Sequence, residues 1–115
     1  MRIRPIPKRL LPHAAMLHKE IAEDRWGKSH LDDGVPLKHV KLESSTQIIR
    51  DKNNAEIQLA ATLFFDCVNS QPAGQSFVVD DVIIFNGERF CVKTIETLYV
   101  DEQPHHYEMG LIRSG

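Results

Sequence analysis

The chain has 115 residues, of which 42% are hydrophobic and 26% are charged, and its formal net charge is −2. This length fits one domain with one hydrophobic core. The near-neutral charge argues against a dedicated nucleic-acid binder, and no apolar run is long enough to cross a bilayer.

We expect residues 1–12 to form an extended arm, followed by a single β-barrel domain at residues 13–115. The arm contains three prolines, which fix φ and remove backbone donors, so we expect no helix there. Residues 1–17 carry four basic side chains and no acid, which leaves the remaining residues with a formal charge of −6. Two interpretations stay open: a solvated tail, or an arm that contacts another copy or an acidic partner.

The first candidate strand covers residues 13–21. Its composition would also suit a helix, but no helical pattern occurs elsewhere, so we predict a strand. Residues 23–34 (EDRWGKSHLDDG) are polar and contain two glycines, which is typical of a loop. Residues 37–43 follow as a strand, because apolar and polar residues alternate in them.

Residues 44–56 (SSTQIIRDKNNAE) are polar apart from one isoleucine pair. This is long for a hairpin connection, where about two to five residues are usual. Two interpretations stay open: a long functional loop, or a hairpin that projects as an arm with Asn53-Asn54 at its tip. Residues 57–67 then alternate strictly with one wholly apolar face, which predicts a strand.

Residues 82–95 (VIIFNGERFCVKTI) carry the strongest local signal. Two strand-like runs flank Asn86-Gly87, and this dipeptide adopts the positive φ angles that a type I′ hairpin turn requires. We predict a turn at residues 69–75 before this hairpin and a loop at residues 99–103 after it.

The last predicted strand covers residues 104–112, with Gly110 as a possible bulge or corner. About six strands and no convincing helix predict an all-β fold. The expected architecture is a small antiparallel β-barrel with a long projecting loop, because closure of a barrel removes exposed strand edges.

No sequence motif indicates an enzyme, and we expect no cofactor and no metal. Adjacent residues of a strand point to opposite faces, so His105-His106 should not hold one ion. Cys67 and Cys91 are best explained as reduced core thiols of a cytosolic protein, although a disulfide between neighbouring strands is geometrically possible. Three acidic pairs are explained by turn chemistry and solvation: Asp32-Asp33, Asp80-Asp81 and Asp101-Glu102.

Trp26, the only tryptophan, lies beside Arg25 in the predicted polar loop. It could cover one end of the barrel. It could equally anchor an interface, because tryptophan and arginine are enriched at such positions.

Six segments carry a resemblance to a known family: RPIPKRLLPH at residues 4–13, EDRWG at 23–27, RDKNN at 50–54, FDCVNS at 65–70, IFNG at 84–87 and HHYE at 105–108. In this order they resemble the minor capsid protein family of siphophages and prophages of Gram-positive bacteria. The resemblance extends over nearly the whole chain.

This family is similar to the head-completion, or stopper, class of phage head–tail connectors, which has no catalytic activity. The resemblance implies a ring of portal symmetry, expected to be twelvefold, that docks the tail and helps to retain packaged DNA. The implied partners are other copies, the portal adaptor protein, the tail or tail-terminator protein, and nearby double-stranded DNA without sequence recognition. The implied location is the virion neck, and the host cytoplasm before assembly.

Stopper proteins carry a loop that projects into the DNA channel, and residues 44–56 match it by their placement between strands. The channel-loop candidates are therefore Ile48, Ile49, Arg50, Asp51, Lys52, Asn53 and Asn54. The interface candidates are Arg4, Lys8, Arg9, Arg25, Trp26, His105 and Tyr107.

The alternative function is a small-barrel module, SH3-like or OB-like, that binds nucleic acid or a peptide. Such a barrel binds single strands with surface aromatic residues and a positive groove. The chain has eight aromatic residues, of which Phe65, Phe85 and Phe90 are expected in the core.

Overall fold

The computed structural model describes residues 3–23 and 25–114. In these ranges the chain forms ten β-strands and one 3-10 turn, η1 (Lys8–Leu10). The strands are β1 (His13–His18), β2 (Glu20–Glu23), β3 (Ser29–Leu31), β4 (Val35–Ser44), β5 (Ile48–Arg50), β6 (Glu56–Gln58), β7 (Ala61–Asp66), β8 (Val82–Phe85), β9 (Glu88–Val100) and β10 (Gln103–Arg113). No helix in the described ranges is long and apolar enough to cross a membrane.

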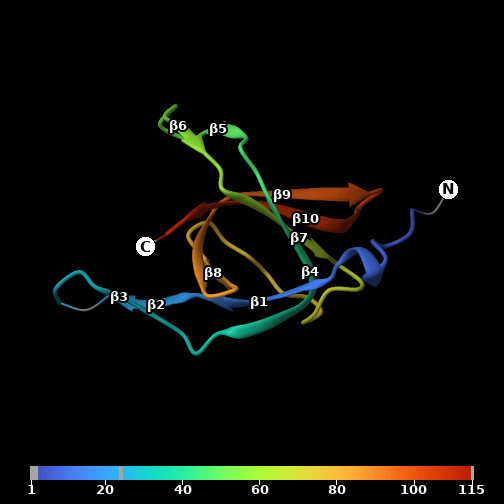
Figure 1. Ribbon diagram of the computed structural model, residues 1–115, viewed down its shortest axis with the longest axis horizontal. Coiled ribbons are helices and arrows are strands. Elements are labelled where there is room, and N and C mark those ends of the chain that lie inside the picture. Colours follow the sequence, from blue (N-terminus) through green and yellow to red (C-terminus); the bar gives the residue numbers. More distant parts are fainter. Residues whose placement is uncertain (1–2, 24, 115) are drawn as a thin grey trace.

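Six strands close into an antiparallel barrel in the order β1-β4-β7-β10-β9-β8 (Figure 1). The predicted all-β barrel is therefore confirmed. The other four strands form two separate hairpins, β2–β3 and β5–β6, and both extend away from the barrel (Figure 1). Closure pairs β1 with both β4 and β8, so β1 is a strand, as predicted.

The barrel interior holds the hydrophobic core. The predicted apolar face of β7 points inward, with Leu63 and Phe65 almost fully buried. The strand predicted over residues 57–67 is, however, interrupted at residues 59–60. There the chain leaves β6 and enters the barrel, and the Ala60 amide donates to the Leu111 carbonyl at 2.8 Å. The core residues are Ala15, Leu17, Leu37, Val40, Ala61, Leu63, Phe65, Ile83, Phe90, Val92, Met109 and Leu111.

The predicted bulge at Gly110 is confirmed by a shift in the β9–β10 register between Gly110 and Leu111. A Cβ atom at Gly110 would lie 2.5 Å from Thr94 Oγ1 and 2.8 Å from Leu59 Cδ1, so the close packing leaves no room for a side chain. A second bulge occurs between His13 and Ala14, opposite His39, which has a φ of 56°. Bulges of this kind bend strands strongly enough to close a small barrel.

The Asn86-Gly87 hairpin is also confirmed, with φ angles of 50° and 78° at its two central residues. The loop predicted at residues 99–103 is wrong. β9 continues to Val100 and β10 begins at Gln103, because Asp101 adopts a φ of 53° and so permits a two-residue turn. Asp is one of the few residues that tolerate this left-handed conformation.

The loop predicted at residues 23–34 is also wrong, because Glu23 ends β2 and residues 29–31 form β3 of the β2–β3 hairpin. The hairpin was hidden in the sequence because it packs no apolar face on the core, and Ile21 is 66% exposed. Period-two alternation appears only where one face of a strand is buried.

Candidate functional site

The β5–β6 hairpin contains all the channel-loop candidates. Ile48 pairs with Gln58, Ile49 with Ile57 and Arg50 with Glu56, so the hairpin interpretation of residues 44–56 is correct. The tip is held by local bonds. The Asp51 carboxylate accepts hydrogen bonds from the amides of Asn53 and Ala55 at 2.8 and 2.9 Å, and Asn54 has a φ of 64°.

The hairpin is polar but carries no net charge. Arg50 donates to Glu56 at 3.1 Å, and the remaining charges, Asp51 and Lys52, are of opposite sign. The exposed apolar side chain is Ile48, which is 59% exposed. A neutral tip of this kind offers no cluster of cations that would hold phosphate groups.

The β5–β6 hairpin stands off the barrel wall. Two hollows lie beside it, of about 460 and 500 Å³, and Ile49 lines both. The first is walled by outward-facing barrel residues such as Phe64, and the second by Val79 and Lys93. Among the bonds that the structure describes, the backbone of this segment is tied to the barrel only at its base, where the Ala60 amide donates to the Leu111 carbonyl of β10 at 2.8 Å.

The arm is docked on the chain's own barrel. The Ile6 amide donates to Asp66 Oδ1 at 3.0 Å, and Asn69 Nδ2 donates to the Ile6 carbonyl at 2.8 Å. Leu11 is buried, so the solvated-tail interpretation is wrong for this part of the arm. The expectation of no helix also needs correction, because one 3-10 turn fits between the prolines at positions 7 and 12. The candidate side chains Arg4, Lys8 and Arg9 remain exposed.

Asp66 receives the arm and was missed in the sequence, where alternation placed it on the polar face. Its carboxylate is fully buried and also accepts hydrogen bonds from the amides of Val68 and Asn69 at 3.0 and 2.8 Å. The backbone amide of Asp66 is also bonded to this turn, because it donates a hydrogen bond to Ser70 Oγ at 2.8 Å. The turn-forming segment after Asp66 was the available signal, because Asp often bonds backbone amides two and three residues on.

His105 and His106 lie side by side, which corrects the expectation that they face opposite ways. A register shift between Pro104 and His106 brings the two Nδ1 atoms to 2.7 Å. His105 Nε2–H donates to the Arg4 carbonyl at 2.7 Å, and His106 Nε2 lies 3.0 Å from Glu108 Oε2. All four ring nitrogens thus have protein partners. In the described ranges, no three His, Cys, Asp or Glu side chains are grouped to hold a metal ion.

Trp26 lies in the turn of the β2–β3 hairpin and is 79% exposed, so the interpretation that it covers the barrel end is wrong. The Arg25 guanidinium lies 4.8 Å from the centre of the Trp26 ring, a cation–π distance. Both interface candidates thus share one projecting tip.

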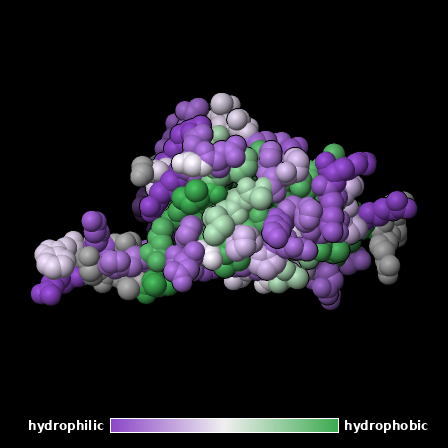
Figure 2. Space-filling model, turned by 60° about the horizontal axis from the view of Figure 1, so that its bottom comes forward, coloured by the Kyte–Doolittle hydropathy of each residue, from purple (hydrophilic) through white to green (hydrophobic). Residues whose placement is uncertain are grey.

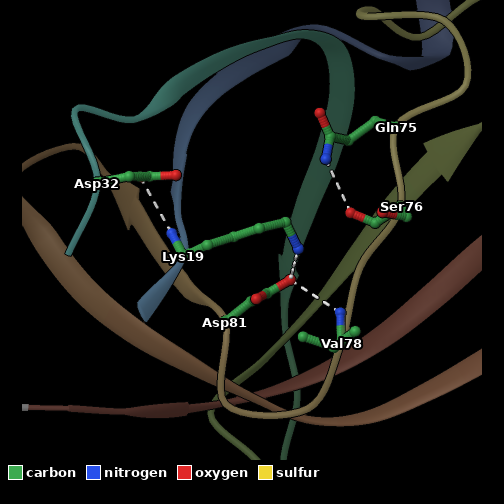
Figure 3. A network of polar contacts seen from close by, with 6 residues as sticks. All are labelled: Lys19, Asp32, Gln75, Ser76, Val78 and Asp81. Atoms are coloured by element: carbon green, nitrogen blue, oxygen red, sulfur yellow. Dashed lines mark hydrogen bonds and ion pairs between the residues drawn. The ribbon is translucent and has the colours of Figure 1, made fainter. Parts of the chain in front are cut away.

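A polar network fixes the base of this hairpin (Figure 3). Lys19 Nζ lies 2.9 Å from Asp81 Oδ2, and the Lys19 amide donates to Asp32 Oδ1 at 3.1 Å. Asp81 also accepts from the Val78 amide at 2.8 Å and is almost fully buried, so solvation does not explain it. In the loop before β8, Gln75 Nε2 donates to the Ser76 carbonyl at 2.8 Å.

Tyr107 is partly buried and packs against the core, with its ring centre 6.3 Å from that of Phe65 and 6.1 Å from that of Phe77. The cysteines are free and only partly buried, which corrects the core-thiol interpretation. A disulfide between neighbouring strands is also wrong, because β10 separates β7 from β9. Burial raises the pKa of the Cys67 thiol despite a hydrogen bond from Tyr107, and burial also raises the pKa of Cys91, so neither is an activated nucleophile.

Comparison with known proteins gives a family and a fold. Residues 7–111 match the model of the minor capsid protein family. No curated protein matches the chain. Among solved structures, the phage-like element PBSX protein xkdH from Bacillus subtilis is similar, with 18% identity, a TM-score of 0.50, and coverage of 89% of this chain and 93% of that one. That similarity supports the barrel fold. The chain belongs to the minor capsid protein family, whose members are structural proteins of phage particles.

Proposed function

We propose that this chain is a head-completion, or stopper, subunit of the phage head–tail connector. In this proposal copies form a ring beneath the portal and its adaptor, dock the tail and help to retain packaged DNA. The protein acts by shape and contact, and no chemical step is assigned to it.

The β5–β6 hairpin carries the proposal. It extends from a closed barrel, stands off the barrel wall and is tied to it only near its base, among the bonds that the structure describes (Figure 1). A ring of rigid barrels would hold such hairpins at fixed positions around a central channel. Because each tip is held by the Asp51 carboxylate, it would keep its shape while it obstructs the channel.

The charge of the hairpin supports the same role. DNA must stay in the head until ejection and then leave without hindrance. Each phosphate that a protein neutralises adds salt-dependent affinity, which would oppose ejection. The Arg50–Glu56 pair and the opposite charges of Asp51 and Lys52 make the tip neutral, so it would obstruct DNA without binding it tightly.

Shortening the hairpin tests the proposal. Replacement of residues 51–55 by Asn-Gly keeps the Arg50–Glu56 pair and closes it with a two-residue type I′ turn. We expect thermal unfolding close to that of the unchanged protein, because the core residues lie elsewhere. Particles assembled with this variant should lose packaged DNA or fail to join tails, measured as the fraction of full, tailed particles by electron microscopy.

A variant with a hairpin of unchanged length separates the effect of hairpin length from the effect of the tip sequence. Lys52→Ser with Asn53→Ser keeps the Asp51 bonds, which use backbone amides of the tip, and should give normal particles. The proposal fails if the shortened variant fills and joins tails normally. It also fails if labelled protein is found in the particle away from the neck.

A further inference from the structure

The β2–β3 hairpin presents an aromatic side chain that lies largely in solvent. Trp26 is 79% exposed and Ile21, on the same hairpin, is 66% exposed. The hairpin extends beyond the barrel at the left end of Figure 2. The Lys19–Asp81 ion pair holds its base against the barrel, so the tip is presented from a fixed support.

A hollow of about 670 Å³, here called the end pocket, is lined entirely by residues outside this hairpin. The residues that line it are mostly apolar, and one of these residues, Val68, is 69% exposed. The arm forms part of the wall, and the β9–β10 turn contributes one carboxylate. The residues that matter here are Ile3, Pro5, Val68, Val100, Pro104 and Asp101.

The hairpin and the end pocket lie at opposite ends of the molecule. Its longest dimension is 53 Å, and in Figure 1 this axis has the β2–β3 hairpin at the left and the β9–β10 turn toward the right. One chain therefore cannot place its own Trp26 in its own end pocket. A tryptophan side chain that fills the end pocket therefore has to come from another molecule.

We propose that Trp26 of one copy inserts into the end pocket of the next copy, with Arg25 beside Asp101. A buried tryptophan removes about 150–250 Å² of surface from water, and the pocket walls are apolar. The charges agree, because Arg25 stacks on Trp26 and Asp101 lines the pocket. Among the described residues no basic side chain is ion-paired with Asp101.

This contact joins two different faces, so it is heterologous and generates a ring if its rotation closes. The inference rests on the proposed ring and deepens it, because it assigns the two surfaces that adjacent subunits use. The choice of a second copy over an unrelated partner comes from the match between the Arg25–Trp26 tip and a pocket with apolar walls and one carboxylate.

Trp26 reports on the contact directly, because it is the only tryptophan in the chain. We expect its fluorescence emission to move to shorter wavelength as the protein is concentrated from about 10 µM to about 1 mM, the range suited to a small interface. Val68→Arg should abolish this shift, because it fills the pocket and opposes Arg25. Val79→Arg is the matched control, an exposed valine outside the end pocket, and should keep the shift.

Mixing two variants tests the direction of the contact. Trp26→Ala gives no tryptophan signal but keeps the end pocket, whereas Val68→Arg keeps the tryptophan and loses the pocket. Added Trp26→Ala should move the emission of Val68→Arg to shorter wavelength. Sedimentation of the mixture should show pairs and nothing larger, because each pair has used its one working tip and its one working pocket.

Three results would overturn the inference: an unchanged emission of the unaltered protein up to about 1 mM, a concentration-dependent shift that survives Val68→Arg, or larger assemblies in the mixture. The proposed function is tested separately by the particles with the shortened β5–β6 hairpin. If those particles lose DNA while Trp26→Ala particles have intact necks, the stopper role stands and only this contact is wrong.

Discussion

Among the single residues, Asp66 joins the N-terminal arm to the turn after β7, although Ile6 lies 60 residues before it in the sequence. Its buried carboxylate accepts from Ile6 in the arm and from Val68 and Asn69 in the turn after β7. A buried carboxylate is stable only when hydrogen bonds replace its lost hydration, and here three amides do so. The sequence shows the turn chemistry, but the contact with Ile6 spans 60 residues and exists only once the barrel has formed.

Asp66→Ala should lower the free energy of unfolding by about 3 kcal/mol, because it leaves three amides without their charged acceptor. Urea denaturation followed by circular dichroism measures the change. Asp51→Ala is the matched control, since it also removes two amide bonds but at the hairpin tip near solvent, and it should cost less than about 1 kcal/mol. Equal losses in the two variants would show that burial of Asp66 is not the cause.

The histidine pair shows a second limit at this scale. Alternation along a strand predicted that His105 and His106 face apart, yet one register shift places their rings together. A bulge of this kind leaves little trace in the sequence. No glycine marks it between Pro104 and His106, and its position is set by the pairing of β10 with β9. The same shift brings His105 to the Arg4 carbonyl.

Among the elements, those that pack on the core could be predicted and those that project could not. The Asn86-Gly87 turn and the apolar face of β7 are read directly from the sequence, because local chemistry and burial determine them. The β2–β3 hairpin lacks a buried face and therefore lacks a periodic pattern. The β5–β6 hairpin was predicted only as one of two alternatives, since each of its strands is only three residues long.

The contribution of the arm to the free energy of unfolding can be measured by deletion. Deletion of residues 1–7 removes the hydrogen bonds of Ile6 and of the Arg4 carbonyl but keeps the buried Leu11. We expect a folded barrel that is less stable by about 2 kcal/mol, with faster amide hydrogen exchange at Val68 and Asn69. Arg4→Ala is the control, because the bond uses the Arg4 carbonyl and the exposed side chain makes no part of it.

Unchanged stability and exchange after the deletion would mean that the arm is not held to the barrel in solution. The same variant bears on the end pocket, because Ile3 and Pro5 form part of its wall. If Trp26 uses that pocket, the deletion should weaken the concentration-dependent emission shift as well.

For the whole molecule, the net charge of −2 predicts weak binding to DNA. We expect binding to linear duplex DNA weaker than about 100 µM at ~150 mM salt, measured by fluorescence anisotropy. Asp51→Lys with Glu56→Lys is the positive control, because it makes the hairpin strongly basic and should add salt-dependent binding. Tight, salt-dependent binding by the unaltered protein would favour the alternative of a small-barrel module that binds nucleic acid.

The docked arm has a consequence for the order of events during synthesis. Arg4 and Ile6 leave the ribosome before their partners, because His105 and Asp66 lie 101 and 60 residues further along the chain. Domains form as their chains emerge, so the arm has to wait for β10 before it can dock. The end pocket, which includes Ile3 and Pro5 as well as Pro104 of β10, is then complete only after β10 has formed. Nascent or truncated chains would therefore be excluded from joining their neighbours.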